Sequence, residues 1–365
     1  ARELAELGAV YDSGALSNRN IIINGGMQCW QRATAATAAD STYNTVDRFR
    51  AYKNVGAYTT ERSDDHPTGA GFSLKAQCTT ADTSLSASEY VFINHEVEGQ
   101  NLQHFEYGTS TAKNVTLSFW VKSSKTGIYT VGVYKHAGSA TGYMYRREYT
   151  INAANTWEKK EFTISPTAGS TTFITNSGGS ITNSNGNGFG ISFNLAMGSN
   201  FHGANDTWET GAKYATSNQV NWVDSTSNNF YLAQVQMEVG SEATPFEHLS
   251  YGDELARCRR YTFVHQTNVA YAWGAISGYS NTTTNALTFY QYPVEMRATP
   301  SLSTSGGFQL ADGHSVYSVS SMSAGTLSPI TARVDVAASG LTVGRVAMIR
   351  NDNDADAKIT FDAEL

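Results

Sequence analysis

The chain has 365 residues, 40% of them hydrophobic, which is enough for two or three globular domains. Charged residues make up only 16%, and a net charge of −7 argues against a nucleic-acid binder, which needs a basic face. With 32 Gly, 20 Tyr and 16 Phe but only 6 Pro, the composition is typical of β-rich proteins of secreted or virion type. A sugar-rich, neutral partner suits such a surface.

Membrane and metal signals are missing from the sequence. No run approaches the roughly 18 apolar residues of a membrane span, and the first residues lack the basic and apolar blocks of a signal peptide. Cys29, Cys78 and Cys258 are far apart and form no CxxC pair, which predicts buried free thiols. We therefore expect no membrane insertion and no cofactor, and release from a cell by lysis or assembly.

Residues 1–20 are predicted to form a short helical segment. Leu4, Leu7 and Val10 lie on one helical stripe, but about two turns of helix are not stable alone in water. The stripe fits either a frayed helix packed on its own domain or a short parallel coil around an oligomer axis. In the second case the segment serves oligomerisation.

Residues 21–248 show the alternation of β-strands. In residues 115–123 the apolar positions share one face, and residues 126–135 follow after a short turn, so we expect these two strands to pair. Further strands are predicted at residues 21–23, 157–164, 188–197 and 230–239. Gly-, Ser- and Asn-rich loops separate them, and the pattern predicts an all-β fold with a jelly-roll β-sandwich.

The alternation typical of β-strands is interrupted after residue 248. Residues 249–262 predict a helical connector, in which Asp253 can cap a short helix. Residues 263–365 are again β-like and have the size of one small domain. The predicted order is thus a short helical segment, a jelly-roll sandwich, a connector helix and a smaller C-terminal β domain.

No catalytic motif stands out, and the acidic clusters have ordinary explanations. Glu96 and Glu98 share one face of a predicted strand, which we interpret as a solvated sheet face rather than a catalytic pair. Asp352, Asp354 and Asp356 alternate and could gather oxygen ligands for Ca²⁺, but the run lacks the glycine and glutamate of an EF-hand. An Asp-rich hairpin turn is the interpretation that we prefer.

Aromatic residues give the best indication of a binding surface. Exposed aromatic faces stack on sugar rings while Asn, Ser and Thr bond the hydroxyls. The alternative is that each ring belongs to the core or a subunit interface. The candidates for receptor or glycan binding lie near the start of the last domain and are Tyr271, Trp273, Tyr279, Tyr290 and Tyr292. The remaining tryptophans are expected to be structural in the sandwich: Trp30, Trp120, Trp157, Trp208 and Trp222.

Several sequence blocks together resemble a family of bacteriophage tail-fibre and virion structural proteins. The blocks include SNRNIIINGGMQCWQRAT, STYNTVDRFRAY, NVTLSFWVKSSKTGIYTVGVY, FYLAQVQMEVGSEATPFEHLSYGDELARCRRYTF and the terminal FDAEL. The resemblance is strong over residues 17–263 and weak over the final domain. It implies a virion role and, between SFWVKS and FYLAQVQMEVG, a jelly roll of the carbohydrate-binding-module type.

The resemblance also raises the question of a structural Ca²⁺. Modules of this type often hold one with an acid in the turn near the first strand and another in a late strand. Here residues 24–28 lack that acid, and Ala233-Gln234 stands where an Asp is usual. The sequence therefore predicts no bound metal.

The function that we expect is that of a phage tail-fibre subunit, as a homotrimer in the virion, with the last domain facing the host. It would bind a surface glycan or lipopolysaccharide reversibly and multivalently, while its N-terminal segment contacts tail or baseplate proteins. Three alternatives remain: a virion decoration protein without receptor binding, a polysaccharide-degrading tail spike, and a soluble carbohydrate-binding module.

Overall fold

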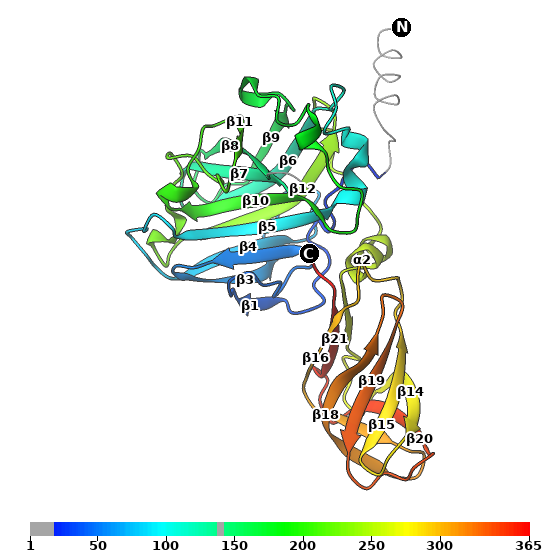
Figure 1. Ribbon diagram of the computed structural model, residues 1–365. Coiled ribbons are helices and arrows are strands. Elements are labelled where there is room, and N and C mark those ends of the chain that lie inside the picture. Colours follow the sequence, from blue (N-terminus) through cyan, green and yellow to red (C-terminus); the bar gives the residue numbers. More distant parts are fainter. Residues whose placement is uncertain (1–17, 137–141) are drawn as a thin grey trace. The chain divides into compact units, whose positions relative to one another are not determined.

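The computed structural model describes residues 18–136 and 142–365, so the predicted stripe of Leu4, Leu7 and Val10 lies outside the described residues. The described chain is built mainly of antiparallel strands (Figure 1) and divides into two compact units. One unit ends at Glu254 and includes Leu365, and the other covers Leu255–Glu364. The all-β fold predicted from the sequence is confirmed.

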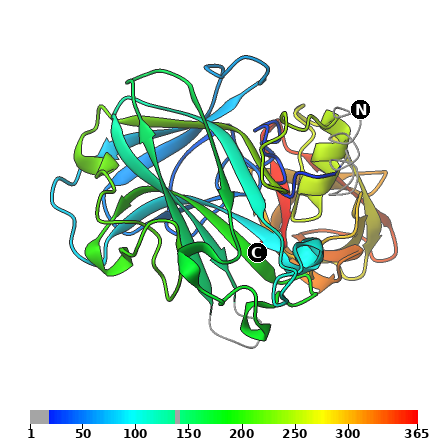
Figure 2. The ribbon, with the colours of Figure 1, turned by 90° about the horizontal axis from the view of Figure 1, so that it is seen from above.

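The first unit is a β-sandwich of two six-stranded sheets, with its strands in blue to green in Figure 2. The first sheet has the order β1-β3-β4-β12-β6-β9, with bounds Ala35–Thr37, Ala57–Ser63, Ser73–Thr80, Asn229–Val239, Val115–Ser123 and Glu158–Ile164. The second has the order β11-β8-β7-β10-β5-β2, with bounds Thr207–Thr210, Tyr143–Ile151, Gly127–Lys135, Asn187–Met197, Tyr90–Glu98 and Phe49–Lys53.

The core of the sandwich follows the predicted alternation. The inward positions of β6 and β10 are fully buried, which stabilises the unit because each large apolar side chain contributes roughly 1.5–3 kcal/mol on burial. Trp208 and Trp222 are also fully buried, whereas Trp30, Trp120 and Trp157 are partly exposed. The three cysteines are buried thiols outside any disulfide, as predicted.

The predicted pairing of β6 with β7 is wrong. β6 pairs with β9 and β12, while β7 pairs with β8 and β10, so the two strands lie in opposite sheets. The chain crosses between the sheets after Ser123, whose hydroxyl lies 3.1 Å from the phenol oxygen of Tyr129 on β7. Both strands bury one apolar face, and a hairpin and a sheet-to-sheet crossover produce the same alternation.

The connector contains helix α2 (Tyr251–Arg259). Its cap is Ser250 rather than the predicted Asp253, because the Asp253 N–H donates to the Ser250 hydroxyl (3.2 Å). That hydroxyl donates in turn to the Asp253 carboxylate (2.6 Å), which holds the serine side chain in the capping position. None of the helices in the two described ranges has the length and apolarity needed to cross a membrane.

The second unit contains a closed six-stranded barrel and a three-stranded sheet. The barrel order is β14-β15-β19-β18-β17-β20, with bounds Trp273–Ser280, Asn285–Gln291, Thr331–Ala338, Val316–Leu327, Phe308–Ala311 and Val346–Asn351 (yellow to red in Figure 1). The small sheet has the order β13-β21-β16, with bounds Thr262–His265, Lys358–Asp362 and Ser301–Ser305. Buried Val334, Leu310, Ile349 and Phe361 belong to one shared core.

Candidate functional site

The outer face of the barrel carries three exposed aromatic rings. Side chains alternate across a strand, so Trp273 and Tyr279 of β14 and Phe289 of β15 lie on the side away from the core. Their exposed fractions are 52%, 47% and 50%, which is high for such large rings. Tyr279 is paired with Leu287, and Phe289 is two residues further along β15. Tyr279 and Phe289 are therefore diagonal neighbours, about 7–8 Å apart between their Cα atoms.

Two of the predicted binding residues do not belong to this face. Tyr290 and Tyr292 are only 6% and 5% exposed, and their rings pack at 5.2 and 5.0 Å from the Phe361 ring. Tyr290 is a core residue because β15 alternates, which turns Tyr290 inward where Phe289 turns outward, and Tyr292 is buried just after the end of the strand. Phe289 was not among the predicted binding residues, although the alternation of residues 285–291 indicates that it faces outward.

A pocket of about 540 Å³ lies beside the Phe289 ring. It is lined by Phe289, Tyr290, Gln291, Thr326, Thr331, Ala332 and Arg333. Its rim thus combines one aromatic face with an amide, two hydroxyls and a guanidinium, which both donate and accept hydrogen bonds. A neutral, hydroxyl-rich ligand is the kind of molecule that such a mixture can orient.

Arg333 is held in position at this pocket. It is paired with Phe289 across β15 and β19, and its Nε lies 3.0 Å from a carboxylate oxygen of Asp335. Gly325 on β18 provides the space, since a Cβ atom there would lie 2.3 Å from the Arg333 Nε. The ion pair also engages Asp335, an acidic residue on the same strand.

Tyr271 lies in the turn before β14 and is 47% exposed. Its ring centre is 5.4 Å from the guanidinium carbon of Arg350, and the Trp273 ring centre is 5.3 Å from the same atom. Arg350 is paired with Trp273 across β20 and β14. Tyr271 and Trp273 thus meet at Arg350, while Tyr279 lies on the outer face of the same strand, six residues beyond Trp273.

The carboxylates Glu96 and Glu98 are buried, so their interpretation as a solvated sheet face is wrong. One Glu96 oxygen lies 2.9 Å from His136 Nε2, and the other accepts a hydrogen bond from the Asn94 amide (2.6 Å). Glu98 accepts a hydrogen bond from the Gln100 amide (2.6 Å). The sandwich tolerates the buried side chains because partners within it satisfy their hydrogen-bonding needs.

A connecting segment covers part of the outer face of the second sheet. The Tyr214 ring stacks on Phe92 of β5 with ring centres 5.2 Å apart, and the Tyr214 carbonyl accepts a hydrogen bond from the Asn194 amide (2.7 Å). Gln219 accepts from both the N–H and the hydroxyl of Thr130 on β7. These hydrogen bonds occupy polar groups of the sheet that would otherwise be available to bind a ligand.

The acidic run at residues 352–356 is a connection between two sheets and not a hairpin turn. It leads from β20 of the barrel to β21 of the small sheet. Asp352 accepts from the Gln309 amide (2.8 Å), and Asp354 accepts from the N–H groups of Gly307 and Asp356 (both 3.0 Å). Among the described residues, no group of three His, Cys, Asp or Glu side chains could hold a metal ion.

The turn at residues 23–26 has its own hydrogen-bond network where the resemblance raised the question of a Ca²⁺. The Asn24 amide donates to the carbonyls of Cys29 (2.9 Å) and Asp47 (3.0 Å). Its oxygen accepts from the N–H groups of Gln28 and Cys29. Both carbonyl oxygens thus already bind an N–H donor, so this donor set does not suit a cation.

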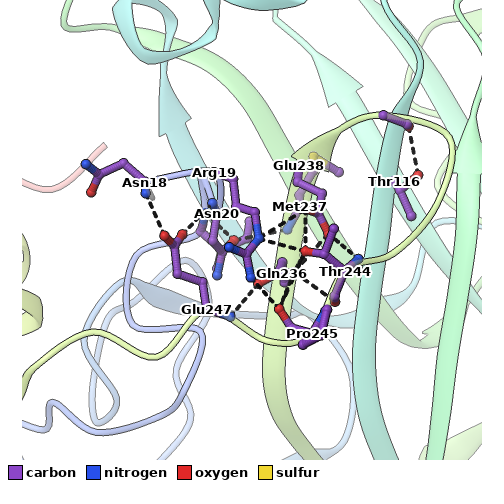
Figure 3. Close-up of polar contacts among 12 residues, drawn as sticks. Asn18, Arg19, Asn20, Thr116, Gln236, Met237, Glu238, Thr244, Pro245 and Glu247 are labelled. Atoms are coloured by element: carbon purple, nitrogen blue, oxygen red, sulfur yellow. Dashed lines mark hydrogen bonds and ion pairs between the residues drawn. The ribbon is translucent and has the colours of Figure 1, made fainter. Parts of the chain in front are cut away.

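The segment that enters the sandwich is fixed to the end of β12 by a polar cluster (Figure 3). The Asn20 side chain donates to the Val235 carbonyl (3.1 Å) and accepts from the Met237 N–H (3.0 Å). Arg19 lies 3.4 Å from the buried carboxylate of Glu238 and donates to the Thr244 hydroxyl (2.7 Å). Residues 21–23, which were predicted to form a strand, instead follow this cluster as an irregular segment and a turn.

No protein-family model matches the chain, and no curated protein matches it in sequence. Solved structures with a distant likeness include the enzymatically active domain of tailspike protein 4 of bacteriophage CBA120. It is 10% identical, with a TM-score of 0.30 over 61% of this chain, and the chain spans only 22% of that structure. The family 11 carbohydrate-binding module of a Clostridium thermocellum cellulosomal cellulase is 13% identical, with a TM-score of 0.28 over 57% of this chain and 96% of the module. The C-terminal family 22 module of Clostridium thermocellum Xyn10B is 11% identical, with a TM-score of 0.31 over 63% of this chain and 100% of that chain.

Proposed function

We propose that the outer face of the C-terminal barrel binds carbohydrate. The observation that supports this is the exposure of Trp273, Tyr279 and Phe289, each about half exposed, on the outer face of β14 and β15, with a pocket beside Phe289. Apolar rings of this size are usually covered unless they contact a partner. Their flat faces suit the C–H surfaces of sugar rings, and the pocket offers groups for the hydroxyls.

The biological role that fits this binding is adsorption of a phage fibre to its host. The sequence resemblance to tail-fibre proteins supports a virion location, a trimer and an attachment role for residues 1–20. A shallow, partly exposed site gives weak single contacts, but linked copies raise the overall affinity by about 10²-fold or more. In this proposal the protein binds a surface glycan or lipopolysaccharide and does not cleave it.

The test is a panel of bacterial surface oligosaccharides, measured with the full chain and with Trp273→Ala, Tyr279→Ala and Phe289→Ala. We expect wild type to bind at least one oligosaccharide, and each variant to lose about 10-fold or more in affinity at an unchanged melting temperature. Val316→Ala is the matched control, because Val316 is 46% exposed but lies on β18, which neighbours neither β14 nor β15. Binding that none of the three aromatic substitutions weakens would contradict the proposal.

A contact with another protein copy is the second candidate for this face. The observation that favours it is that apolar Val346 and Leu287 are paired directly with Tyr279 in the neighbouring strands, and Val346 is 44% exposed. Light scattering distinguishes the two functions. If the aromatic substitutions dissociate an oligomer and leave glycan binding intact, the face is an assembly contact.

A further inference from the structure

Arg350 lies beside the aromatic face and has no anionic partner among the described residues. Its guanidinium carbon lies 5.4 Å from the Tyr271 ring centre and 5.3 Å from that of Trp273. Its Nε donates to the Gln309 side-chain oxygen (2.9 Å). No ion pair joins Arg350 to a carboxylate in the described part of the chain, whereas the nearby Arg333 and Arg345 are paired with Asp335 and Asp312.

The residues around Arg350 fix its position. Gln309 is paired with Arg350 across β17 and β20, and its amide nitrogen bonds Asp352 (2.8 Å), so that the glutamine orients the guanidinium from one side. The hydrogen bond uses Nε only. The two terminal nitrogens make no hydrogen bond to a described residue, and the side chain is partly exposed. They therefore form a donor edge that a ligand can reach.

The turn that carries Tyr271 is also fixed. Tyr271 has a φ of 58°, a left-handed conformation that is unfavourable for a bulky residue and needs support from its surroundings. Buried Asn351 gives this support, since its amide donates to the Thr267 hydroxyl (2.7 Å) and the Val269 carbonyl (3.3 Å), and its N–H donates to the Ala272 carbonyl (3.2 Å). The residue next to Arg350 in sequence thus holds the ring that lies beside Arg350 in space.

We propose that Arg350, with Tyr271 and Trp273, forms a subsite for the carboxylate of an acidic sugar, such as a uronic or sialic acid. Guanidinium groups bind carboxylates with two parallel hydrogen bonds, and the free terminal nitrogens of Arg350 supply that fork. The neighbouring rings limit hydration of the charge and give the sugar an apolar surface. This inference rests on the proposed carbohydrate function and replaces the neutral ligand that the composition suggested.

The charges nearby allow this subsite but limit its strength. Asp352, Asp354 and Asp356 follow on the same connection, and Asp352 is linked to Arg350 through Gln309. Their carboxylates repel a second anion at longer range, which salt screens. The expected ligand therefore carries isolated carboxylates rather than dense phosphate.

The test compares acidic oligosaccharides with their own methyl esters, which keep the sugar and remove the charge. The probes are oligogalacturonate, sialyllactose and a hyaluronan tetrasaccharide, each measured with the full chain as wild type, Arg350→Gln and Arg350→Lys. We expect wild type to bind at least one free acid roughly 10-fold more tightly than its ester, and Arg350→Gln to bind both equally. Arg350→Lys should retain part of the preference for the free acid, because lysine keeps the positive charge but loses the two parallel N–H donors of the guanidinium.

The outcomes separate this inference from the proposed function. Equal binding of acid and ester by wild type contradicts the acidic subsite and leaves carbohydrate binding standing. Loss of ester binding in Arg350→Gln shows a structural role for the arginine and also overturns the inference. Failure of wild type to bind any acid or ester contradicts the subsite, and failure on the surface-oligosaccharide panel as well contradicts the proposed function.

Discussion

Phe289 and Arg333 lie opposite each other across β15 and β19, on the outside of the barrel. The ring is half exposed, and the guanidinium is fixed by Asp335 at 3.0 Å. The flat Phe289 ring sets the plane of a sugar ring that stacks on it, and a hydrogen bond from the Arg333 guanidinium sets the rotation of that sugar within the plane. The pair therefore accounts for orientation, which stacking on an aromatic surface alone does not provide.

Gly325→Ala tests the position of Arg333 without changing any group that lines the pocket. The new Cβ atom would lie 2.3 Å from the Arg333 Nε and 2.6 Å from an Asp335 oxygen, so both flexible side chains must move. We expect glycan affinity to fall about 3- to 10-fold, with little change in melting temperature. Isothermal titration of the full chain measures this, and an unchanged affinity would show that the position of Arg333 does not matter.

Substitutions of Tyr290 test whether this residue, which was predicted to bind the ligand, belongs to the core. Burial raises the pKa of Tyr290, and its hydroxyl has no hydrogen-bond partner among the described residues. Tyr290→Phe should therefore leave the stability unchanged or raise it, while Tyr290→Ala should cost about 3–5 kcal/mol through the cavity that it creates. Calorimetric unfolding distinguishes the two variants, and a Tyr290→Ala protein of normal stability would contradict the core assignment.

The contrast between Phe289 and Tyr290 shows how far the sequence could predict the site. Composition and alternation predicted the β fold, the core faces of β6 and β10, and an aromatic cluster near the start of the last domain. They did not predict which tyrosines are buried, because an aromatic residue suits either face of a strand and only the register decides.

The pairing between strands could not be predicted from the sequence either. β6 and β7 are consecutive and separated by a short turn, yet they belong to opposite sheets. Likewise, the ion pair at Arg333, and the lack of one at Arg350 among the described residues, depend on which residues meet across strands. Contacts of this kind join positions far apart in the chain, and local patterns do not specify them.

Deletions at the N-terminal side separate attachment from folding. Removal of residues 1–17 should leave the melting temperature of the sandwich unchanged. Removal of residues 1–20 also takes away Asn20, with its buried hydrogen bonds to β12, and Arg19, with its ion pair to Glu238, which should cost about 2–4 kcal/mol. Calorimetry on both truncated proteins measures the difference.

Equal stability of the two truncated proteins would show that the polar cluster in Figure 3 does not stabilise the sandwich. If residues 1–17 attach the protein to a virion partner, both deletions should abolish that contact. Retention of the contact by either protein would contradict the proposed attachment role.

The hydrogen bonds to Asp312 predict that the barrel loses stability in acid. The N–H of Ser315 at 2.7 Å, with donors from His314, Arg345 and Tyr317, holds the pKa of the Asp312 carboxyl well below its ordinary value of 3.8. Because its folded pKa is depressed, Asp312 stabilises the barrel above the unfolded pKa, and this contribution is lost as the pH falls toward the folded pKa.

The Asp312→Asn variant isolates this effect from the other carboxylates. We expect it to melt below wild type at neutral pH, with the difference shrinking between about pH 5 and pH 2. Calorimetric melting in parallel over this range checks the sign. A difference that stays constant with pH would show that the carboxylate does not have a depressed pKa in the folded barrel.

Footprinting of the full chain by hydroxyl radicals, with and without an oligosaccharide that it binds, tests the central claim most directly. Oxidation of exposed aromatic side chains reports where the ligand covers the protein. We expect protection of Trp273, Tyr279 and Phe289, with no change at Tyr251, which is 58% exposed outside the barrel. Protection confined to the sheets of the first unit, with the three barrel rings oxidised as before, would contradict it.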